Sequence, residues 1–303
     1  MKKFLLALSI LLLGASACFA KTTLNVATFN MRLYTDSDKN AGNGWEQRGP
    51  VCARLAMFHD FDIFGTQELY KFQIDDMLRW MPGYNYIGVA RDDGKEQGEH
   101  SAIFYRTDVF EVVESGNFWL SETPDRPGKG WDAACVRICT WGHFKDKKTG
   151  FEFLMFNLHM DHIGVVARNE SALLIQKKVK EFGATLPVIL TGDFNIDQRG
   201  EGYFTVLKTG LKDSYELAEM RYAENGTFNS WYSDRFTDQR IDHVFVSPCF
   251  KVKKYGVLTD SYRRKEQGIV ENPQDSPAEL MIEKYSARMP SDHFPVKVIL
   301  EVE

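Results

Sequence analysis

Leu186-Pro-Val-Ile-Leu-Thr-Gly-Asp-Phe-Asn195 joins a short apolar run directly to a glycine, an acid and an amide. The apolar part predicts a strand buried within a sheet. Asp193 and Asn195 would point to the same side of an extended chain, and Gly192 would let backbone approach a ligand closely. An Asp at the mouth of a sheet can orient and deprotonate water. Since Asp-x-Asn also occurs in turns and helix caps, this stretch indicates a site only together with others.

Short strands of this kind recur along the whole chain, and most of them end in a polar or charged cluster. Helical spacing of apolar residues is found in three segments, near residues 51–58, 74–81 and 172–182. Many strands, few helices and no regular βαβ alternation predict sheets that carry helices on their outer faces. The strands are expected at residues 24–30, 62–66, 84–90, 101–105, 136–144, 151–159, 187–191, 240–246 and 295–302.

Three more of these segments contain polar residues that a reaction could use. His159 lies near the end of the run Phe156-Asn-Leu-His-Met-Asp-His162, and Asp242 begins an apolar strand. Asp292 and His293 are adjacent and stand between two prolines. Polar groups in core-like strands are costly unless they are paired or used, so these residues are candidates for an active site.

Two strands near the N-terminal end close on oxygen-bearing side chains. Asn30 ends the strand at residues 24–30, and Glu68 follows the strand at residues 62–66. Hard cations prefer oxygen ligands, and Mg²⁺ takes one or two carboxylates while water and substrate phosphate complete its shell. We therefore expect a magnesium site, with Mn²⁺ as the alternative metal.

Taken together, these segments resemble the endonuclease/exonuclease/phosphatase superfamily of deoxyribonuclease I-like metal-dependent phosphoesterases, and the chain is similar to a secreted bacterial member. The resemblance implies an α/β (α+β) fold, a four-layer αββα sandwich with two central mixed or antiparallel β-sheets and a site at one edge between them. The match runs in order through Thr-Phe-Asn-Met, Thr-Gln-Glu, Gly-Glu-x-Ser-Ala-Ile-Phe-Tyr-Arg, Asn-Leu-His-Met-Asp-His, Thr-Gly-Asp-Phe-Asn, Arg-Ile-Asp-His and Ser-Asp-His-Phe-Pro-Val.

The resemblance also implies roles for the matched residues on the metal and water side of the site. Glu68 would bind Mg²⁺, with Asn30 and Asp292 close enough to help. Asp193 would align or deprotonate the attacking water. Asn195 would hold a phosphate oxygen.

The same resemblance implies how negative charge would be stabilised during in-line attack of water on phosphorus. His159 and His293 would donate hydrogen bonds to the developing charge. Asp242 would hold His293 in its tautomer and orientation. Glu99 would support His159, as in the deoxyribonuclease branch of the superfamily.

Other residues are candidates for the substrate side. Trp45, Arg48 and Arg168 are expected to line it, and Arg168 follows the histidine-rich segment closely enough for its guanidinium to meet a second phosphate. An exposed arginine on a helix is the alternative interpretation of Arg168. Residues 259–289 are mostly polar and predict a surface loop that covers the pocket of a small substrate.

The N-terminal segment has the three-part pattern of a secretory signal. Residues 1–20 combine two lysines, an apolar run and small residues, which leaves residues 21–303 as the enzyme domain. Cleavage before Lys21 competes with lipidation at Cys18, which would give an outer-membrane lipoprotein. No later stretch approaches the roughly 20 apolar residues of a membrane-spanning helix. We expect a periplasmic or extracellular monomer.

The charge of the chain bears on its substrate. The formal net charge of −5 becomes −7 once the two lysines of the leader are removed. This negative charge disfavours non-specific binding to the nucleic-acid backbone. A phosphorylated small molecule is therefore expected as partner rather than nucleic acid, as a phosphomonoester or phosphodiester such as a sugar or inositol phosphate. A secreted nuclease and an inactive binding module on the same fold are the alternatives. A zinc hydrolase is disfavoured because Asn157 stands where a zinc signature has its first histidine.

Overall fold

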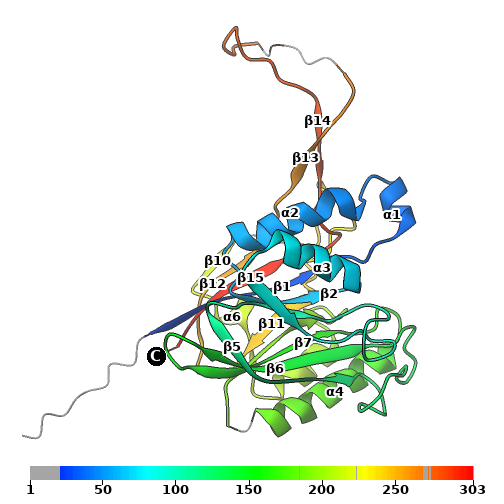
Figure 1. Ribbon diagram of the computed structural model, residues 1–303, viewed down its shortest axis with the longest axis vertical. Helices are drawn as coiled ribbons and strands as arrows, with labels where there is room; N and C mark the ends of the chain where they lie inside the picture. Colours follow the sequence, from blue (N-terminus) through cyan, green and yellow to red (C-terminus); the bar gives the residue numbers. More distant parts are fainter. Residues whose placement is uncertain (1–20, 184, 223, 269–271, 273, 303) are drawn as a thin grey trace, which may run out of the picture.

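Two β-sheets contain the strands that the apolar runs predict (Figure 1). The computed structural model describes residues 21–183, 185–222, 224–268, 272 and 274–302, so the predicted leader and Cys18 lie outside the described residues. The seven-stranded sheet has the order β10 (Met220–Tyr222), β12 (Lys251–Val257), β15 (Val296–Val302), β1 (Thr22–Asn30), β2 (Ile63–Gln67), β4 (Ile103–Arg106) and β3 (Tyr84–Ile87). The six-stranded sheet has the order β5 (Phe110–Trp119), β6 (Ile138–Asp146), β7 (Glu152–His159), β8 (Val188–Asp193), β11 (Asp242–Val246) and β9 (Lys212–Asp213).

Helices cover the outer face of each sheet and complete four layers. On the seven-stranded sheet lie α2 (Trp45–Phe58) and α3 (Lys71–Trp80), whereas α4 (Val165–Phe182) and α5 (Glu201–Leu207) cover the other sheet (Figure 1). Two shorter helices, α1 (Asp36–Asn40) and α6 (Ser214–Leu217), lie in connections. The αββα sandwich implied by the resemblance is confirmed. Among the described residues, no helix combines the length and apolar character that crossing a membrane requires.

The central strands are apolar at nearly every position because both of their faces are buried. In β7, Phe153 and Met155 face the opposite sheet, while Phe156 and Leu158 face α4. The period of two residues in a strand therefore distributes one continuous apolar run between two cores. This explains why the sequence shows runs here instead of alternation.

Strand direction brings the polar ends of the strands to one edge of the sandwich. β1 runs parallel to β2 and β7 runs parallel to β8, so the carboxyl ends of each pair lie together. His159 pairs with Asp193 in the register of β7 and β8. Asp242 pairs with Asp193 at the start of the antiparallel strand β11. Five separate stretches of sequence thus meet at one place.

Beneath this edge a buried asparagine joins the two sheets. The Asn157 side chain on β7 donates from Nδ2 to the carbonyl of Thr66 on β2 at 2.9 Å, and its Oδ1 accepts from Gln67 and Thr191 at 2.7 and 3.1 Å. Gly65 makes this approach possible, since a Cβ there would lie 2.1 Å from Asn157 Oδ1. Paired polar groups at this depth hold the sheets in one register.

Residues 259–289 differ from the loop that was predicted to cover a small-substrate pocket. β13 (Tyr262–Lys265) and β14 (Tyr285–Arg288) form an antiparallel hairpin that projects from the body beside α2 (Figure 1). None of the described residues of this arm lines the pocket that contains the predicted catalytic residues. The prediction of a covering loop is therefore wrong, because two strands pair with each other and carry the segment away from the site.

Candidate active site

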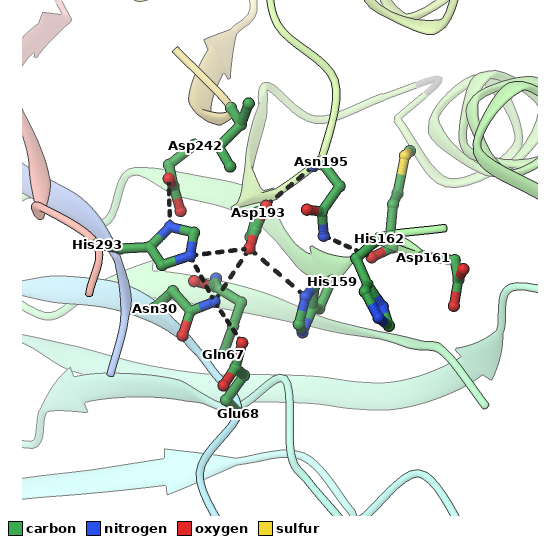
Figure 2. A network of polar contacts seen from close by, with 12 residues as sticks. Asn30, Gln67, Glu68, His159, Asp161, His162, Asp193, Asn195, Asp242 and His293 are labelled. Carbon is green, nitrogen blue, oxygen red and sulfur yellow. Dashed lines mark hydrogen bonds and ion pairs between the residues drawn. The ribbon is translucent and has the colours of Figure 1, made fainter. Parts of the chain in front are cut away.

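The predicted catalytic residues stand at strand ends along the shared edge and point toward one another (Figure 2). Asn30, His159 and Asp193 are the last residues of β1, β7 and β8, and Glu68 follows β2. Asp242 opens β11, and the pair Asp292 and His293 precedes β15, which runs antiparallel to β1. The sequence motifs therefore converge because their strands end or begin at the same edge.

Asp193 lies at the centre of this cluster. Its Oδ2 accepts a hydrogen bond from Asn30 Nδ2 at 3.0 Å, and its Oδ1 accepts one from the Asn195 backbone at 2.9 Å. The Nε2 atoms of His159 and His293 lie 3.5 and 3.7 Å from Oδ2. Burial, together with the charge of Asp242, raises the pKa of Asp193 to about 7. A carboxylate with such a pKa is suited to accept a proton near neutral pH.

His293 is held by a buried carboxylate. Its Nδ1 lies 2.8 Å from Asp242 Oδ2, so this nitrogen donates and Nε2 turns toward Asp193. Burial lowers the pKa of His293, but Asp242 and Asp193 outweigh it and raise the pKa well above the usual value. His293 is therefore cationic at neutral pH and can donate from Nε2.

His159 has a different environment, which the sequence did not reveal. Its Nδ1 lies 3.0 Å from Nη1 of Arg137, and since a guanidinium only donates, Nδ1 accepts and Nε2 carries the proton. Burial and the charge of Arg137 lower the pKa of His159 well below the usual value. Glu99 is 3.9 Å from Nδ1 and accepts instead from Arg91 at 2.6 Å. The direct partner of His159 is thus Arg137 rather than Glu99.

Carboxylates and an amide form the side of the pocket that suits a divalent cation. Nη1 of Arg32 lies 3.9 Å from a Glu68 oxygen and 3.6 Å from an Asp292 oxygen, so both carboxylates face one positive charge. Burial and the charge of Glu68 raise the pKa of Asp292, and they outweigh the nearby cations, of which His293 has the largest effect. This oxygen-rich set fits a hard divalent metal.

Asn30 is placed to orient these carboxylates. Its Nδ2 donates to Glu68 and Asp193, both at 3.0 Å, and its Oδ1 accepts from the Arg32 backbone. In this arrangement the amide nitrogen, not the oxygen, faces the acids. Asn195 uses one of its two Nδ2 hydrogens in a bond to the carbonyl of Met160 at 3.0 Å.

Backbone strain is concentrated around the pocket. Arg32, Glu68 and Asn195 have φ angles of 56°, 70° and 49°, in the left-handed region that side chains rarely adopt. Each such residue costs about 1 kcal/mol or more and persists only where its surroundings hold it. Here the hydrogen bonds of Asn30 and Asp193 to these segments do so.

Two residues expected on the substrate side are buried instead. Arg48 is fully buried, and its guanidinium donates to the carbonyls of Arg32 at 2.6 Å and Leu33 at 3.2 Å. Trp45 is 3% exposed, and its Nε1 donates to Asp76 at 3.0 Å. The prediction that these side chains line the substrate side is wrong. Carbonyls of the loop after β1 bind Arg48, whereas Trp80 and Asp76 of α3 contact Trp45. Helical spacing alone does not show either contact.

The pocket has a volume of about 300 Å³ and includes cationic residues that sequence reasoning missed. Arg91 lies in a turn-like stretch and Arg137 in a strand-like stretch. In each case the charge of the arginine was the only feature of the sequence that could have indicated a role. Arg32 directly follows the Thr-Phe-Asn-Met motif and was given no role. A charged residue in an apolar run was therefore the available signal.

A second cavity of about 660 Å³ adjoins this pocket. Asn195 and Phe228 line both spaces. Arg168, at the start of α4, lies on the wall of the second cavity, and its Nη1 donates to the carbonyl of Asp161 at 3.0 Å. Arg168 is thus the one of the three predicted substrate-side residues that faces a cavity.

A two-sheet sandwich with a buried Asp, two imidazoles and adjacent carboxylates defines a phosphoric ester hydrolase. The sequence profile of the Endonuclease/Exonuclease/phosphatase family matches residues 27–293. The chain belongs to this family. Its acidic and histidine clusters can hold a divalent metal ion.

Known proteins share this architecture along nearly the whole chain. The mannosyl-6-phosphatase of Bacteroides thetaiotaomicron is 59% identical, with a TM-score of 0.84, and the alignment covers 91% of this chain and 99% of that one. A family protein from Bacteroides vulgatus is 37% identical, with a TM-score of 0.78, over 93% of this chain and 100% of that one. An uncharacterized protein of Acanthamoeba polyphaga mimivirus is 31% identical, over 85% of this chain and 92% of the relative.

Proposed function

We propose that this enzyme is a Mg²⁺-dependent phosphatase that removes the phosphate from a small phosphorylated sugar. The observation that carries the proposal is the position of Asp193, a buried carboxylate whose Oδ2 faces the Nε2 atoms of two histidines. Such a carboxylate can take a proton from water while the two imidazoles meet the charge on phosphate.

The chemistry follows from the protonation states. A carboxylate oxygen of Asp193 orients the attacking water and accepts its proton. His159 and His293 donate from Nε2 to the phosphate oxygens, and Asn195 donates its remaining amide hydrogen. Glu68 and Asp292 are the residues that would hold Mg²⁺, whose charge neutralises phosphate and leaving oxygen. The P–O bond to the sugar breaks as the P–O bond to water forms, and the leaving oxygen takes the Nε2 proton of the cationic His293, so the sugar leaves as an alcohol.

The substrate class rests on two observations. A relative that is 59% identical is a mannosyl-6-phosphatase, so a sugar phosphate has a precedent among similar proteins. The acidic net charge of the chain disfavours the nuclease alternative. The inactive-module alternative is disfavoured because the matched acids and imidazoles are all present and face one another.

The zinc alternative would need ligands near His162. Cys135, Asp161 and His162 offer atoms within 4.8 Å of one another. However, Nη2 of Arg137 lies 2.9 Å from His162 Nδ1, and Arg137 also contacts Asp161. A fixed guanidinium inside the group disfavours a second cation there.

We also propose that the protein is exported, on the strength of the composition of residues 1–20. Cell fractionation with N-terminal sequencing tests this. Mature protein in the periplasm or medium that begins at Lys21 is the expected result. Acylation at Cys18 would favour the lipoprotein alternative, and cytoplasmic full-length protein would reject export.

A substrate panel tests the proposed function. With Mg²⁺, phosphate release is measured from mannose 6-phosphate and inositol 1-phosphate. Cleavage of single- and double-stranded DNA and RNA is measured by fragment length, and cleavage of sphingomyelin by release of phosphocholine, with Asp193→Asn as the inactive control throughout. We expect the highest kcat/KM for the sugar phosphate and loss of activity with EDTA. Preferential cleavage of a nucleic acid, or restoration by Zn²⁺ alone, would reject the proposal.

A further inference from the structure

The cavity beside the catalytic pocket has about twice the volume of that pocket. Its 660 Å³ lies within the range of roughly 300–1,000 Å³ that is usual for small-molecule sites. We propose that this cavity is the subsite for the sugar ring that carries the phosphate. The proposal rests on the phosphatase function proposed above and assigns the part of the substrate that does not react.

The wall of the cavity is tied to the catalytic residues. Residues 226–239 form this wall, and the Asn229 backbone donates to the carbonyl of Asp292 at 2.7 Å. The ring of Phe228 packs edge-on against His293 with centroids 5.0 Å apart. A ring bound in the cavity is therefore held at a fixed position relative to a phosphate at His293.

Aromatic side chains on this wall are left open to solvent. Phe228, Tyr232 and Phe236 are 42%, 51% and 75% exposed, and all three line the cavity. Exposed apolar groups gathered at a concave site are typical of ligand contact. The flat C–H face of a pyranose offers an apolar surface of matching size to such rings.

The charged residues around the cavity balance one another. The lining contains two arginines, Arg168 and Arg235, and two acids, Asp197 and Glu201. It therefore has no net positive charge. A neighbouring phosphate of a nucleic acid would find no net positive charge here. Hydroxyl groups both donate and accept, and they match a mixed lining of acids, guanidinium groups and amides. The cavity therefore favours a neutral, hydroxylated ring.

Kinetics with two substrates test the subsite. For each variant, the selectivity is kcat/KM for mannose 6-phosphate divided by kcat/KM for propyl phosphate, which has no ring. We expect a wild-type selectivity well above one. Phe236→Ala and Tyr232→Ala should each lower it roughly tenfold, which corresponds to about 1.4 kcal/mol of binding free energy. Competitive inhibition by methyl mannoside should weaken by the same factor.

Phe58→Ala is the matched control, since Phe58 is an 81% exposed aromatic at the end of α2 that lines no part of this cavity. Its selectivity should equal that of the wild type. A wild-type selectivity near one, an unchanged selectivity in both cavity variants, or a preference for adenosine 5′-monophosphate would overturn the subsite while leaving a phosphatase. Absence of phosphate release from either ester by the metal-loaded enzyme would instead reject the proposed function itself.

Discussion

The catalytic pocket and the adjoining cavity are built from different parts of the fold. The pocket collects strand ends from both sheets, and its central residues are nearly inaccessible, with Asp193 1% exposed. The cavity is walled by the starts of α4 and α5 and by residues 226–239, where Phe236 is 75% exposed. Reaction chemistry thus depends on strand register, which cannot shift by one residue without turning side chains to the other face. Substrate choice depends on surface segments that tolerate change.

The largest effect is expected at the centre of the pocket. Asp193→Asn and His159→Ala should each lower kcat by about 10²–10³ because each removes a group that acts on the transition state. Phe236→Ala should lower kcat/KM by only about tenfold. Steady-state phosphate release from mannose 6-phosphate measures the difference. A wild-type kcat in Asp193→Asn would show that the pocket does not contribute more to the rate than the cavity. It would also contradict the assignment of Asp193 to the active site.

A smaller loss is expected when the partner of His293 changes. Asp242→Asn removes the carboxylate that fixes Nδ1 as a donor and keeps the imidazole cationic, so kcat should fall on the order of 10²-fold while KM changes little. Measured kcat and KM, with Asn229→Ala in the cavity wall as comparison, test this. A KM effect without a kcat effect would place Asp242 among the substrate contacts instead.

Substitution of Arg48 tests whether this buried arginine behind the pocket stabilises the fold or contacts the substrate. Arg48→Met leaves carbonyls of the loop after β1 without a donor, so the free energy of unfolding should fall by about 2 kcal/mol. Urea unfolding measures this change. Arg168→Met, a substitution at the cavity surface, is the matched control and should change stability much less. A raised KM with unchanged stability in Arg48→Met would restore its predicted role at the substrate.

The smallest effect concerns Asp161, which lies between the two regions. Its carboxylate accepts from the backbone of Gly164 at 2.8 Å and from Arg137 at 3.3 Å, and its carbonyl accepts from Arg168. Burial raises the pKa of Asp161, but the backbone hydrogen bonds outweigh this and lower the pKa well below the usual value. A lowered pKa stabilises the fold fully above the unfolded value of about 4 and loses that effect as pH falls below it.

Asp161→Asn should therefore be less stable than the wild type by about 1.5 kcal/mol at pH 7. The gap should narrow below about pH 4, where the Asp161 carboxylate of the unfolded wild-type chain takes up a proton while that of the folded chain stays ionised. Urea unfolding of both proteins at pH 7 and at pH 3.5 measures it. A gap that stays constant or widens in acid would show that the charge of Asp161 does not stabilise the fold.

The fold was predictable because its central strands are buried on both faces. Segments such as residues 151–159 and 187–191 are continuous apolar runs with a polar end, and the structure has strands there within one or two residues. β5 (Phe110–Trp119) was missed because much of this edge strand is exposed and reads as polar. The hairpin of β13 and β14 was missed because its strands pair only with each other and have no apolar face.

The candidate site was predictable to a similar degree. Asn30, Glu68, Asp193, Asp242 and His293 were chosen as polar residues at the ends of apolar strands, and the structure brings them within contact of one another. Arg137, directly before β6, escaped notice because the sequence does not show which side chain lies opposite it. Its partner His159 is 22 residues away in sequence and on the neighbouring strand.

The sequence by itself determined that short apolar strands end in acids, amides and histidines, which is enough to specify phosphate-ester chemistry. Only the tertiary structure decided that His159 is held by Arg137, that Arg48 and Trp45 are buried, and that a cavity opens beside Asn195 and Phe228. The physical reason is that periodicity reports which face of an element is apolar. It does not report which element covers that face, and burial, pKa and pocket shape all depend on the covering element.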